Sequence, residues 1–429
     1  MKYEQITKID LLIRILSFEN MAVGAQKPLL VLSILSLIGA IAGFRLDNLL
    51  YRRLGEDPDV NRNASQLITS KGYPCKEYTV QTDDGFILGV QRIPYGRNES
   101  KYTPRPVVFL QHGLLASSTN WLTNLANESL AYILADAGFD VWLGNVRGND
   151  YSKRSIKYKP EQVEFWKWSW DEMAKFDLPA MLGLALKETN QPDLFYIGHS
   201  QGTTIAFAEF STNFELAAKV KMMYALAPVA RVSHMTSPLH YLTYFLPEIQ
   251  FLFDILGEGE FNPSNEFVKW LARDLCPIEE TICSNVLFVI CGYDEKNLNM
   301  SRLPVYFNHD PSGTSVMDVV HYAQMVDSGT FQMYDYGYTD NMAKYNQSTP
   351  PLYIPENMAT PVSIFWGKND WLADPEDVQW LIPKLNKVLQ GNYQFDDYDH
   401  LDFIWGMDAP SRVYAPIIED LKKRSNMTL

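Results

Sequence analysis

The chain has 429 residues, of which 46% are hydrophobic and 13% aromatic, enough to bury a large core in one domain with an insertion or in two domains. The formal net charge of -14 argues against nucleic acid as a partner and against electrostatic attraction to anionic lipid. Any contact with a membrane or a lipid droplet is therefore expected through apolar surface.

The first predicted element is an apolar run of 16 residues, Leu29 to Phe44, which contains the A-x-A pattern Ala40-Ile41-Ala42. This pattern is typical of a secretory signal peptide cleaved before Gly43, so we assign residues 1–42 to an N-terminal extension and signal peptide. The run is short for a membrane span, and an uncleaved signal anchor is the alternative, because about 28 residues precede it. Met21 is a second candidate for the start of translation.

Strand-like and helix-like runs alternate over the next part of the chain. The expected helices include Ser129 to Ala137 and Trp170 to Leu186. The expected strands are Gly85 to Arg92, Pro106 to Leu110, Phe139 to Leu143, Leu194 to Ile197 and Val220 to Leu226. Such alternation predicts an α/β fold with a mostly parallel sheet.

The loop after the second of these strands, Gln111 to Leu115, carries a His-Gly pair at a position where backbone can approach a substrate closely. Acyl transfer needs two backbone N–H donors for the tetrahedral intermediate, one from such a loop and one from the residue after the nucleophile. Leu114 is the candidate donor from the loop. Gln201, which follows the candidate nucleophile Ser200 of the motif described next, is the second candidate donor. A His-Gly pair alone is weak evidence, because glycine after a strand is more often part of a plain turn.

The most informative motif is Gly198-His199-Ser200-Gln201-Gly202, which follows the strand-like run Leu194 to Ile197 and opens an apolar-periodic stretch from Thr203 to Phe210. A G-x-S-x-G motif in this strand-turn-helix setting predicts a nucleophile elbow, because the glycines let the chain turn sharply enough to expose the serine oxygen. We therefore expect serine-dependent acyl transfer by Ser200 on an α/β-hydrolase core whose first part spans residues 43–230. An ordinary glycine-rich turn is the alternative.

Beyond Ala227-Pro228-Val229-Ala230 the composition changes to a region rich in proline, methionine and aromatic residues, and the strand signal returns only at Pro361. We predict that residues 231–357 form an inserted, mainly helical cap, and that residues 358–429 complete the core. The apolar clusters of the predicted cap fit its helical interior. Part of the cap surface also fits a lid that exposes apolar area at a lipid interface.

The candidate acid of the catalytic set follows the last predicted strand, Pro361 to Trp366. Two aspartates, Asp370 and Asp374, lie just beyond it. Asp374 precedes Pro375 and an acidic first turn, a pattern that predicts the N-cap of a helix. Asp370 is therefore the favoured partner of the catalytic histidine, and Asp374 is the fallback.

The candidate base is His400, because this hydrolase architecture requires the chain order Ser, Asp or Glu, His. Of the histidines at positions 112, 199, 234, 240, 309, 321 and 400, only His400 lies beyond the last predicted strand. It sits in a polar loop that leads to an apolar segment, as expected of a base reaching across the top of the sheet. A surface histidine is the alternative, and the remaining cap histidines are expected to be structural or exposed.

Several long stretches of the chain resemble the acid lipase family of the gastric and lysosomal type, and the resemblance extends from about Asp57 to the C-terminus. The stretches that carry it are 110–117 (LQHGLLAS), 140–145 (DVWLGN), 171–180 (DEMAKFDLPA) and 400–405 (HLDFIW). The resemblance implies hydrolysis of triacylglycerols, or of cholesteryl esters in lysosomal members. It also implies Ser200, Asp370 and His400 as the triad and the amides of Leu114 and Gln201 as the oxyanion hole, in agreement with the residues already derived.

The four cysteines are Cys75, Cys276, Cys283 and Cys291. The resemblance favours a disulfide between Cys276 and Cys283, which would leave Cys291 as a free, buried thiol. Cys75 departs from the gastric-type pattern, and its pairing stays open. No histidine pair accompanies the cysteines at the spacing of a zinc site, so no metal is expected.

Six N-x-S/T sequons favour passage through the secretory pathway, to the cell exterior or the lysosomal lumen. They lie at Asn63, Asn98, Asn127, Asn299, Asn346 and Asn426.

The leading hypothesis is thus a serine hydrolase of neutral lipid esters, acting at an oil-water or membrane interface without cofactor, nucleic acid or obligate protein partner. Three alternatives compete with it. They are an esterase of small soluble esters, a catalytically silent binding protein and a membrane-anchored hydrolase. The intact Ser200, Asp370 and His400 set argues against the silent protein.

Overall fold

The computed structural model describes residues 57–97, 103–248, 259–261, 286–292 and 294–427. The predicted signal peptide, the sequon at Asn98 and both cysteines of the expected disulfide, Cys276 and Cys283, lie outside the described residues.

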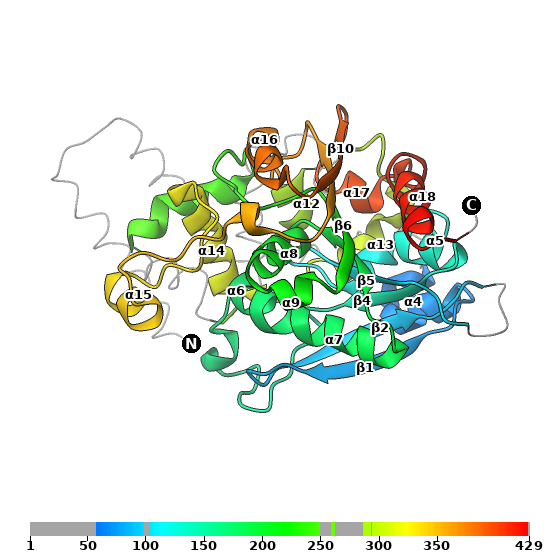
Figure 1. The fold of residues 1–429 in the computed structure, drawn as a ribbon, viewed down its shortest axis with the longest axis horizontal. Coiled ribbons are helices and arrows are strands. Elements are labelled where there is room, and N and C mark those ends of the chain that lie inside the picture. The colour runs from blue at the N-terminus through cyan, green and yellow to red at the C-terminus, as the bar shows by residue number, and fades with distance from the viewer. Residues whose placement is uncertain (1–56, 98–102, 249–258, 262–285, 293, 428–429) are drawn as a thin grey trace, which may run out of the picture. The chain divides into compact units, whose positions relative to one another are not determined.

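An eight-stranded sheet carries the fold (Figure 1), with the strand order β1-β2-β4-β3-β5-β6-β9-β10. β2 pairs antiparallel with both β1 and β4, and the other neighbouring strands are parallel. The strands are β1 (Lys76–Gln81), β2 (Ile87–Ile93), β3 (Val107–Gln111), β4 (Asp140–Gly144), β5 (Leu194–His199), β6 (Val220–Leu226), β9 (Val362–Gly367) and β10 (Leu389–Phe395). The predicted α/β fold with a mostly parallel sheet is confirmed.

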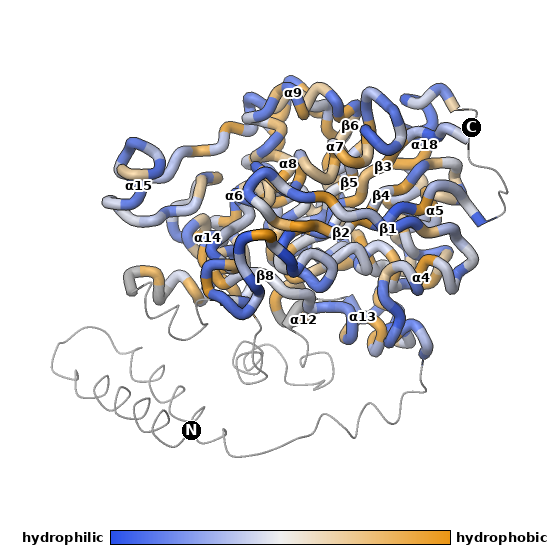
Figure 2. Tube along the Cα trace, turned by 90° about the horizontal axis from the view of Figure 1, so that it is seen from below, coloured by the Kyte–Doolittle hydropathy of each residue, from blue (hydrophilic) through white to orange (hydrophobic). Residues whose placement is uncertain are grey.

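Helices cover both faces of this sheet (Figures 1 and 2), with α7 (Leu178–Thr189) and α8 (Gln201–Thr212) on one face and α4 (Ala64–Ser70) and α5 (Leu130–Asp136) on the other. A parallel sheet covered on both sides buries every residue of its central strands, which is why β3, β4, β5 and β9 consist of continuously buried residues. Hydrophobic residues accordingly follow the central strands in Figure 2. None of the described helices is both long and hydrophobic enough to cross a lipid bilayer.

The predicted helix from Trp170 to Leu186 is present but interrupted. It consists of α6 (Trp170–Glu172), a π-helical turn η4 (Met173–Asp177) and α7. The core also contains α9 (Phe214–Ala217), α16 (Pro375–Leu381), α17 (Asp402–Trp405) and α18 (Ala415–Arg424). The remaining short turns of the core and its flanks are η1 (Pro58–Asn61), η2 (Ser118–Trp121), η3 (Val163–Trp166), η9 (Ile382–Leu385) and η10 (Pro410–Tyr414).

The region between β6 and β9 is mainly helical in its described part. It contains η5 (Pro238–Glu248), α12 (Val286–Cys291), η7 (Met300–Arg302), α13 (Leu303–His309), α14 (Val316–Ser328), α15 (Tyr338–Tyr345), η8 (Pro355–Asn357) and a two-stranded ribbon of β7 (Glu260–Phe261) and β8 (Thr314–Ser315). Residues 51–429 form one compact unit, so the boundaries of the cap at residues 231 and 357 stay a prediction.

Aromatic stacking and a partly buried carboxylate attach this region to the core. His321 of α14 stacks on Trp170 of α6 with ring centroids 4.3 Å apart. The neighbouring Asp171 accepts hydrogen bonds of 2.8 Å from the amide of Tyr334 and the hydroxyl of Tyr353. The contact therefore joins the two regions through specific side chains.

Candidate active site

Ser200 occupies the sharp turn between β5 and α8 with φ 54° and ψ -122°, a backbone conformation that is strained for a residue with a side chain. The flanking glycines make the turn possible. A Cβ on Gly198 would lie 2.7 Å from the carbonyl oxygen of Gly202, and a Cβ on Gly202 would lie 2.4 Å from the carbonyl oxygen of Gln111. Both positions exclude any side chain, so the turn has the strand-turn-helix form that the sequence predicts.

His400 follows β10 and meets Asp370, which follows β9. Nδ1 of His400 lies 2.9 Å from Oδ2 and 3.0 Å from Oδ1 of Asp370, and both residues are buried. The amides of Leu372 and Ala373 donate to Oδ1 of the same carboxylate over 2.9 and 2.8 Å. The carboxylate thus holds the proton of the imidazole on Nδ1, which leaves Nε2 free to act as a base.

Asp374 serves a different purpose. It is the N-cap of α16, and its Oδ1 accepts the amide of Glu376 over 2.8 Å. The structure therefore places the helix cap at Asp374 and the histidine contact at Asp370, as the local sequence pattern indicates.

Ser200 and His400 line one small pocket together with Gly113, Leu114, Ile290 and Leu401. The pocket encloses about 20 Å³, which is room for about one water molecule, and Ser200 is 7% exposed. Ile290 and the neighbouring Cys291 come from α12, so residues between β6 and β9 cover the serine. The described residues therefore cover most of the serine.

The two candidate N–H donors lie beside the serine. Gly113 approaches Ser200 so closely that a Cβ on Gly113 would lie 2.9 Å from the Cβ of Ser200, and Leu115 turns the loop back with φ 57°. Leu114 directly follows Gly113 in the sequence, and Gln201 directly follows Ser200. Within the described part of the chain, neither of their amides donates a hydrogen bond to a protein acceptor. Their roles as donors stay predictions.

Two buried histidines brace the site. The sequence places His199 in the nucleophile turn and His112 in the His-Gly loop, but it does not predict the contacts of their rings. His199 donates from Nε2 to the carbonyl oxygen of His400 over 2.9 Å, and burial keeps its pKa well below the ordinary value. His112 donates from Nδ1 to the carbonyl oxygen of Gly113 over 2.9 Å and accepts the amide of Val146 over 3.3 Å, while burial lowers its pKa to about 4. His199 thus contacts the backbone of His400 and His112 that of Gly113, and both of these residues line the pocket of Ser200.

The four other histidines have structural contacts, as expected. His234 contacts the Asp377 carboxylate over 2.9 Å, His240 the carbonyl oxygen of Ser237 over 2.8 Å, and His309 that of Asp59 over 3.0 Å. His321 contacts the carbonyl oxygen of Gln332 over 2.9 Å.

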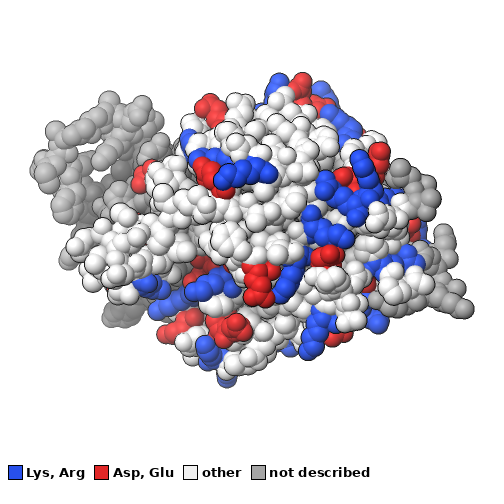
Figure 3. Space-filling model, viewed as in Figure 1, with Lys and Arg blue, Asp and Glu red and all other residues white. Residues whose placement is uncertain are grey.

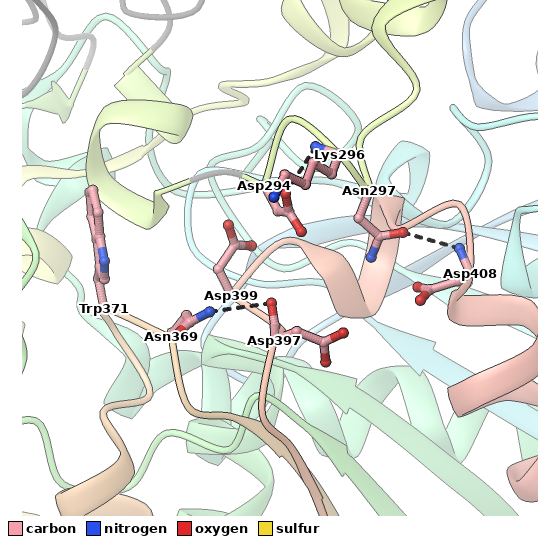
Figure 4. A pocket seen from close by; sticks show the side chains of 8 residues that line it. All are labelled: Asp294, Lys296, Asn297, Asn369, Trp371, Asp397, Asp399 and Asp408. Carbon is pink, nitrogen blue, oxygen red and sulfur yellow. Dashed lines mark hydrogen bonds between the residues drawn. The ribbon is translucent and has the colours of Figure 1, made fainter.

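A larger cavity of about 660 Å³ adjoins the loop that carries His400, but Ser200 does not line it. Figure 4 shows Asp399 and Asp397 of this loop facing the cavity together with Asp294 and Asn297. Its lining is acidic and polar, so it does not fit an acyl chain.

Among the described cysteines, Cys75 and Cys291 are free thiols, and Cys291 is buried as the sequence predicts. Of the described sequon asparagines, Asn63, Asn127, Asn346 and Asn426 are exposed and Asn299 is partly buried.

Comparison with known proteins places the chain among lipases. Residues 106–407 match a family model described as alpha/beta hydrolase fold, and residues 64–125 match one described as partial alpha/beta-hydrolase lipase region. The chain is 51% identical over 396 residues to gastric triacylglycerol lipase of Rattus norvegicus, covering 91% of this chain and 98% of the relative.

Two human relatives agree with this placement, and one solved structure supports the fold. Gastric triacylglycerol lipase of Homo sapiens is 53% identical over 84% of this chain and 91% of its own length, and human lysosomal acid lipase/cholesteryl ester hydrolase is 48% identical over 86% and 92%. The structure of a soluble variant of monoglyceride lipase from Saccharomyces cerevisiae has a TM-score of 0.51 at 16% identity, covering 82% of this chain and 95% of that one, which supports the fold.

Proposed function

The chain belongs to the α/β-hydrolase lipase family that contains gastric triacylglycerol lipase and lysosomal acid lipase, and from this premise we propose that it cleaves carboxylic esters of neutral lipids through an acyl-enzyme on Ser200. It is a carboxylic ester hydrolase by family. The observation that carries the assignment of residues is the strained Ser200 turn in one pocket with His400, whose Nδ1 lies 2.9 Å from Asp370.

Each step of the reaction uses groups of this pocket. Nε2 of His400 takes the proton of Ser200 Oγ as the oxygen attacks the ester carbonyl. The amides of Leu114 and Gln201 donate to the oxyanion, while Asp370 stabilises the imidazolium. His400 returns the proton to the leaving alcohol, and the acyl group stays on Ser200. A water molecule activated by His400 then releases the fatty acid.

The proposed substrates are triacylglycerols and cholesteryl esters. The relatives are named for these two classes, and the residues around Ser200 that provide side chains to the pocket include the apolar Leu114, Ile290, Leu372 and Leu401. An apolar lining suits an acyl chain taken from a lipid aggregate and does not favour binding of a charged substrate. We expect the enzyme to work at an oil-water or membrane interface.

The proposed location is the secretory pathway, with the lysosomal lumen or the cell exterior as destination. The signal-like segment before Gly43, the exposed sequons and the names of the relatives support it. We also propose that Cys276 and Cys283 form a disulfide. Peptide mapping of the protein secreted by cells would report the cleavage site, the glycans and the disulfide together, and a retained segment 1–42 would indicate a membrane-anchored hydrolase instead.

Hydrolysis of emulsified trioleoylglycerol and cholesteryl oleate, measured side by side at acidic and neutral pH, tests the function. We expect release of fatty acid from at least one emulsion by the wild type and none by Ser200→Ala. Activity on trioleoylglycerol alone would indicate a digestive type, and comparable activity on cholesteryl oleate a lysosomal type. A protein that cleaves soluble short-chain esters but neither emulsion would be a general esterase, and full activity of Ser200→Ala would overturn the mechanism.

A further inference from the structure

One buried hydrogen bond joins the residue after Ser200 to the region between β6 and β9. The side-chain amide of Gln201 donates from Nε2 to Oδ2 of Asp318 over 2.7 Å, although the two residues are 117 positions apart in the sequence. Gln201 is 3% exposed and Asp318 is 0% exposed. Gln201 begins α8 and Asp318 lies in the first turn of α14, so the bond connects the nucleophile turn directly to a helix of the predicted cap.

Asp318 is itself firmly held. Ser315, the N-cap of α14, accepts the amide of Asp318 over 2.9 Å, and the hydroxyl of Thr314 donates to Oδ2 of Asp318 over 2.8 Å. One turn further along α14, His321 stacks on Trp170 of the core. The carboxylate therefore has a fixed position relative to α8, as an anchor requires.

The backbone at Ser200 needs such an anchor. A residue with a side chain keeps φ near 54° only where its surroundings hold it there, because a relaxed backbone lies elsewhere. The peptide between Ser200 and Gln201 contains the N–H proposed as the second oxyanion donor. Rotation of this peptide would move that N–H away from the oxyanion, and the buried hydrogen bond between Gln201 and Asp318 opposes the rotation.

We propose that Asp318 is a positioning residue for catalysis, which holds the side chain of Gln201 and thereby fixes the Gln201 amide toward the oxyanion. This inference rests on the proposed function of Ser200 and Gln201. The donor acts on charge that develops in the transition state, so a loss of its alignment lowers kcat and leaves KM nearly unchanged.

Kinetics on a soluble ester, p-nitrophenyl butyrate, test the proposal with four variants of the full chain. Asp318→Ala is expected to lower kcat by about ten-fold or more, with KM within about two-fold of the wild type. Asp318→Asn keeps an oxygen acceptor for Gln201 and is expected to retain kcat within about three-fold. Gln201→Ala keeps the backbone amide but loses the anchor, so it should match Asp318→Ala. The double variant should be no slower than either single variant, because both substitutions remove the same bond.

Asp171→Ala is the matched control, because Asp171 is a partly buried carboxylate between the core and the same region, and it accepts hydrogen bonds from Tyr334 and Tyr353 instead of Gln201. It is expected to lower the melting temperature and to keep kcat within about two-fold. A folded Asp318→Ala with wild-type kcat, or losses that multiply in the double variant, would overturn the proposal. If Asp318→Ala does not fold, Gln201→Ala decides the question, and wild-type kcat in that variant would be contrary to it. Ser200→Ala, measured in parallel, separates a failure of this inference from a failure of the proposed function.

Discussion

The carboxylate of Asp370 and the imidazole of His400 are the residue-scale feature on which the proposed chemistry depends most. Both are buried, and two backbone amides also donate to the carboxylate, so its position is fixed before substrate arrives. Preorganised contacts of this kind lower the cost of reorganisation during the reaction. Their removal should reduce the rate without unfolding the protein.

Asp370→Asn and Asp374→Asn separate the two acidic candidates. Asp370→Asn should lower kcat by roughly 10⁴-fold, because an amide at this position no longer holds the productive tautomer of His400. Asp374→Asn should stay within about two-fold, because asparagine caps a helix as well as aspartate does. The kcat of both variants on a soluble ester gives the answer, and a large loss in Asp374→Asn alone would reassign the acid.

Glycines at the serine turn give a second prediction at this scale. Gly202→Ala should destabilise the fold by roughly 2 kcal/mol or more, because the new methyl group would overlap backbone atoms of Gln111. Gly183→Ala is the matched control on α7, since nothing lies within 4 Å of a Cβ there, and it should stabilise the fold by roughly 0.5–1 kcal/mol. Urea unfolding of the two variants measures both changes. Equal effects at the two positions would mean that the turn tolerates a side chain.

At the scale of elements, the sequence predicted six strands of the sheet to within three residues and missed β1 and β10. These two strands lie at the sheet edges, where exposed polar residues such as Lys76 and Asn392 interrupt the apolar pattern of a strand. Chain order and turn chemistry led to Ser200, Asp370 and His400 as candidates, and the structure brings Ser200 and His400 into one pocket and His400 into contact with Asp370, while their catalytic roles stay predictions. Sequence patterns could not find Asp318 or the bracing role of His112, because those contacts exist only after distant elements pack together.

Helix α8 carries a buried carboxyl group with a predictable effect on stability. Burial raises the pKa of Glu209 to about 7. The folded protein therefore binds a proton that the unfolded chain releases above about pH 4.5, so the stability contributed by this group is complete below that pH and is lost as the pH rises to 7. Burial also raises the pKa of Asp171 to about 7, so the stability that this group contributes is lost over the same pH range.

Thermal unfolding at pH 5 and at pH 7 tests whether the stability falls as the pH rises. The melting temperature of the wild type should be higher at pH 5, and Glu209→Gln should show a smaller difference between the two values. Glu215→Gln, on a side chain that is 87% exposed, is the control and should keep the wild-type difference. An identical pH dependence in Glu209→Gln and the wild type would show that Glu209 does not titrate in this range.

At the scale of the whole molecule, the covered serine and the surface charge point to recognition through apolar contact. Figure 3 shows acidic and basic side chains interspersed over the face in view, without an extended basic surface. The net charge of -14 also opposes binding to anionic membranes. We propose that access to Ser200 depends on moving residues that cover it, among them Ile290 and Cys291 of α12.

Kinetics on tributyrin across its solubility limit test this dependence. The pocket of about 20 Å³ cannot admit an acyl chain, so hydrolysis of dissolved substrate should be slow and should rise sharply once droplets form. The control is a fully soluble p-nitrophenyl ester over the same range of concentrations, which should follow a simple saturation curve. A saturation curve for tributyrin that passes smoothly through the solubility limit would mean that the site opens without an interface.

The most direct test of the central claim is to trap the acyl-enzyme step with a p-nitrophenyl alkylphosphonate and to locate the adduct by peptide mass spectrometry. The structure and the chemistry predict one phosphonyl group per chain, on Ser200, formed in parallel with complete loss of ester hydrolysis. Modification of another residue, or full inhibition of a Ser200→Ala protein that is still active, would contradict the assignment of Ser200 as the nucleophile.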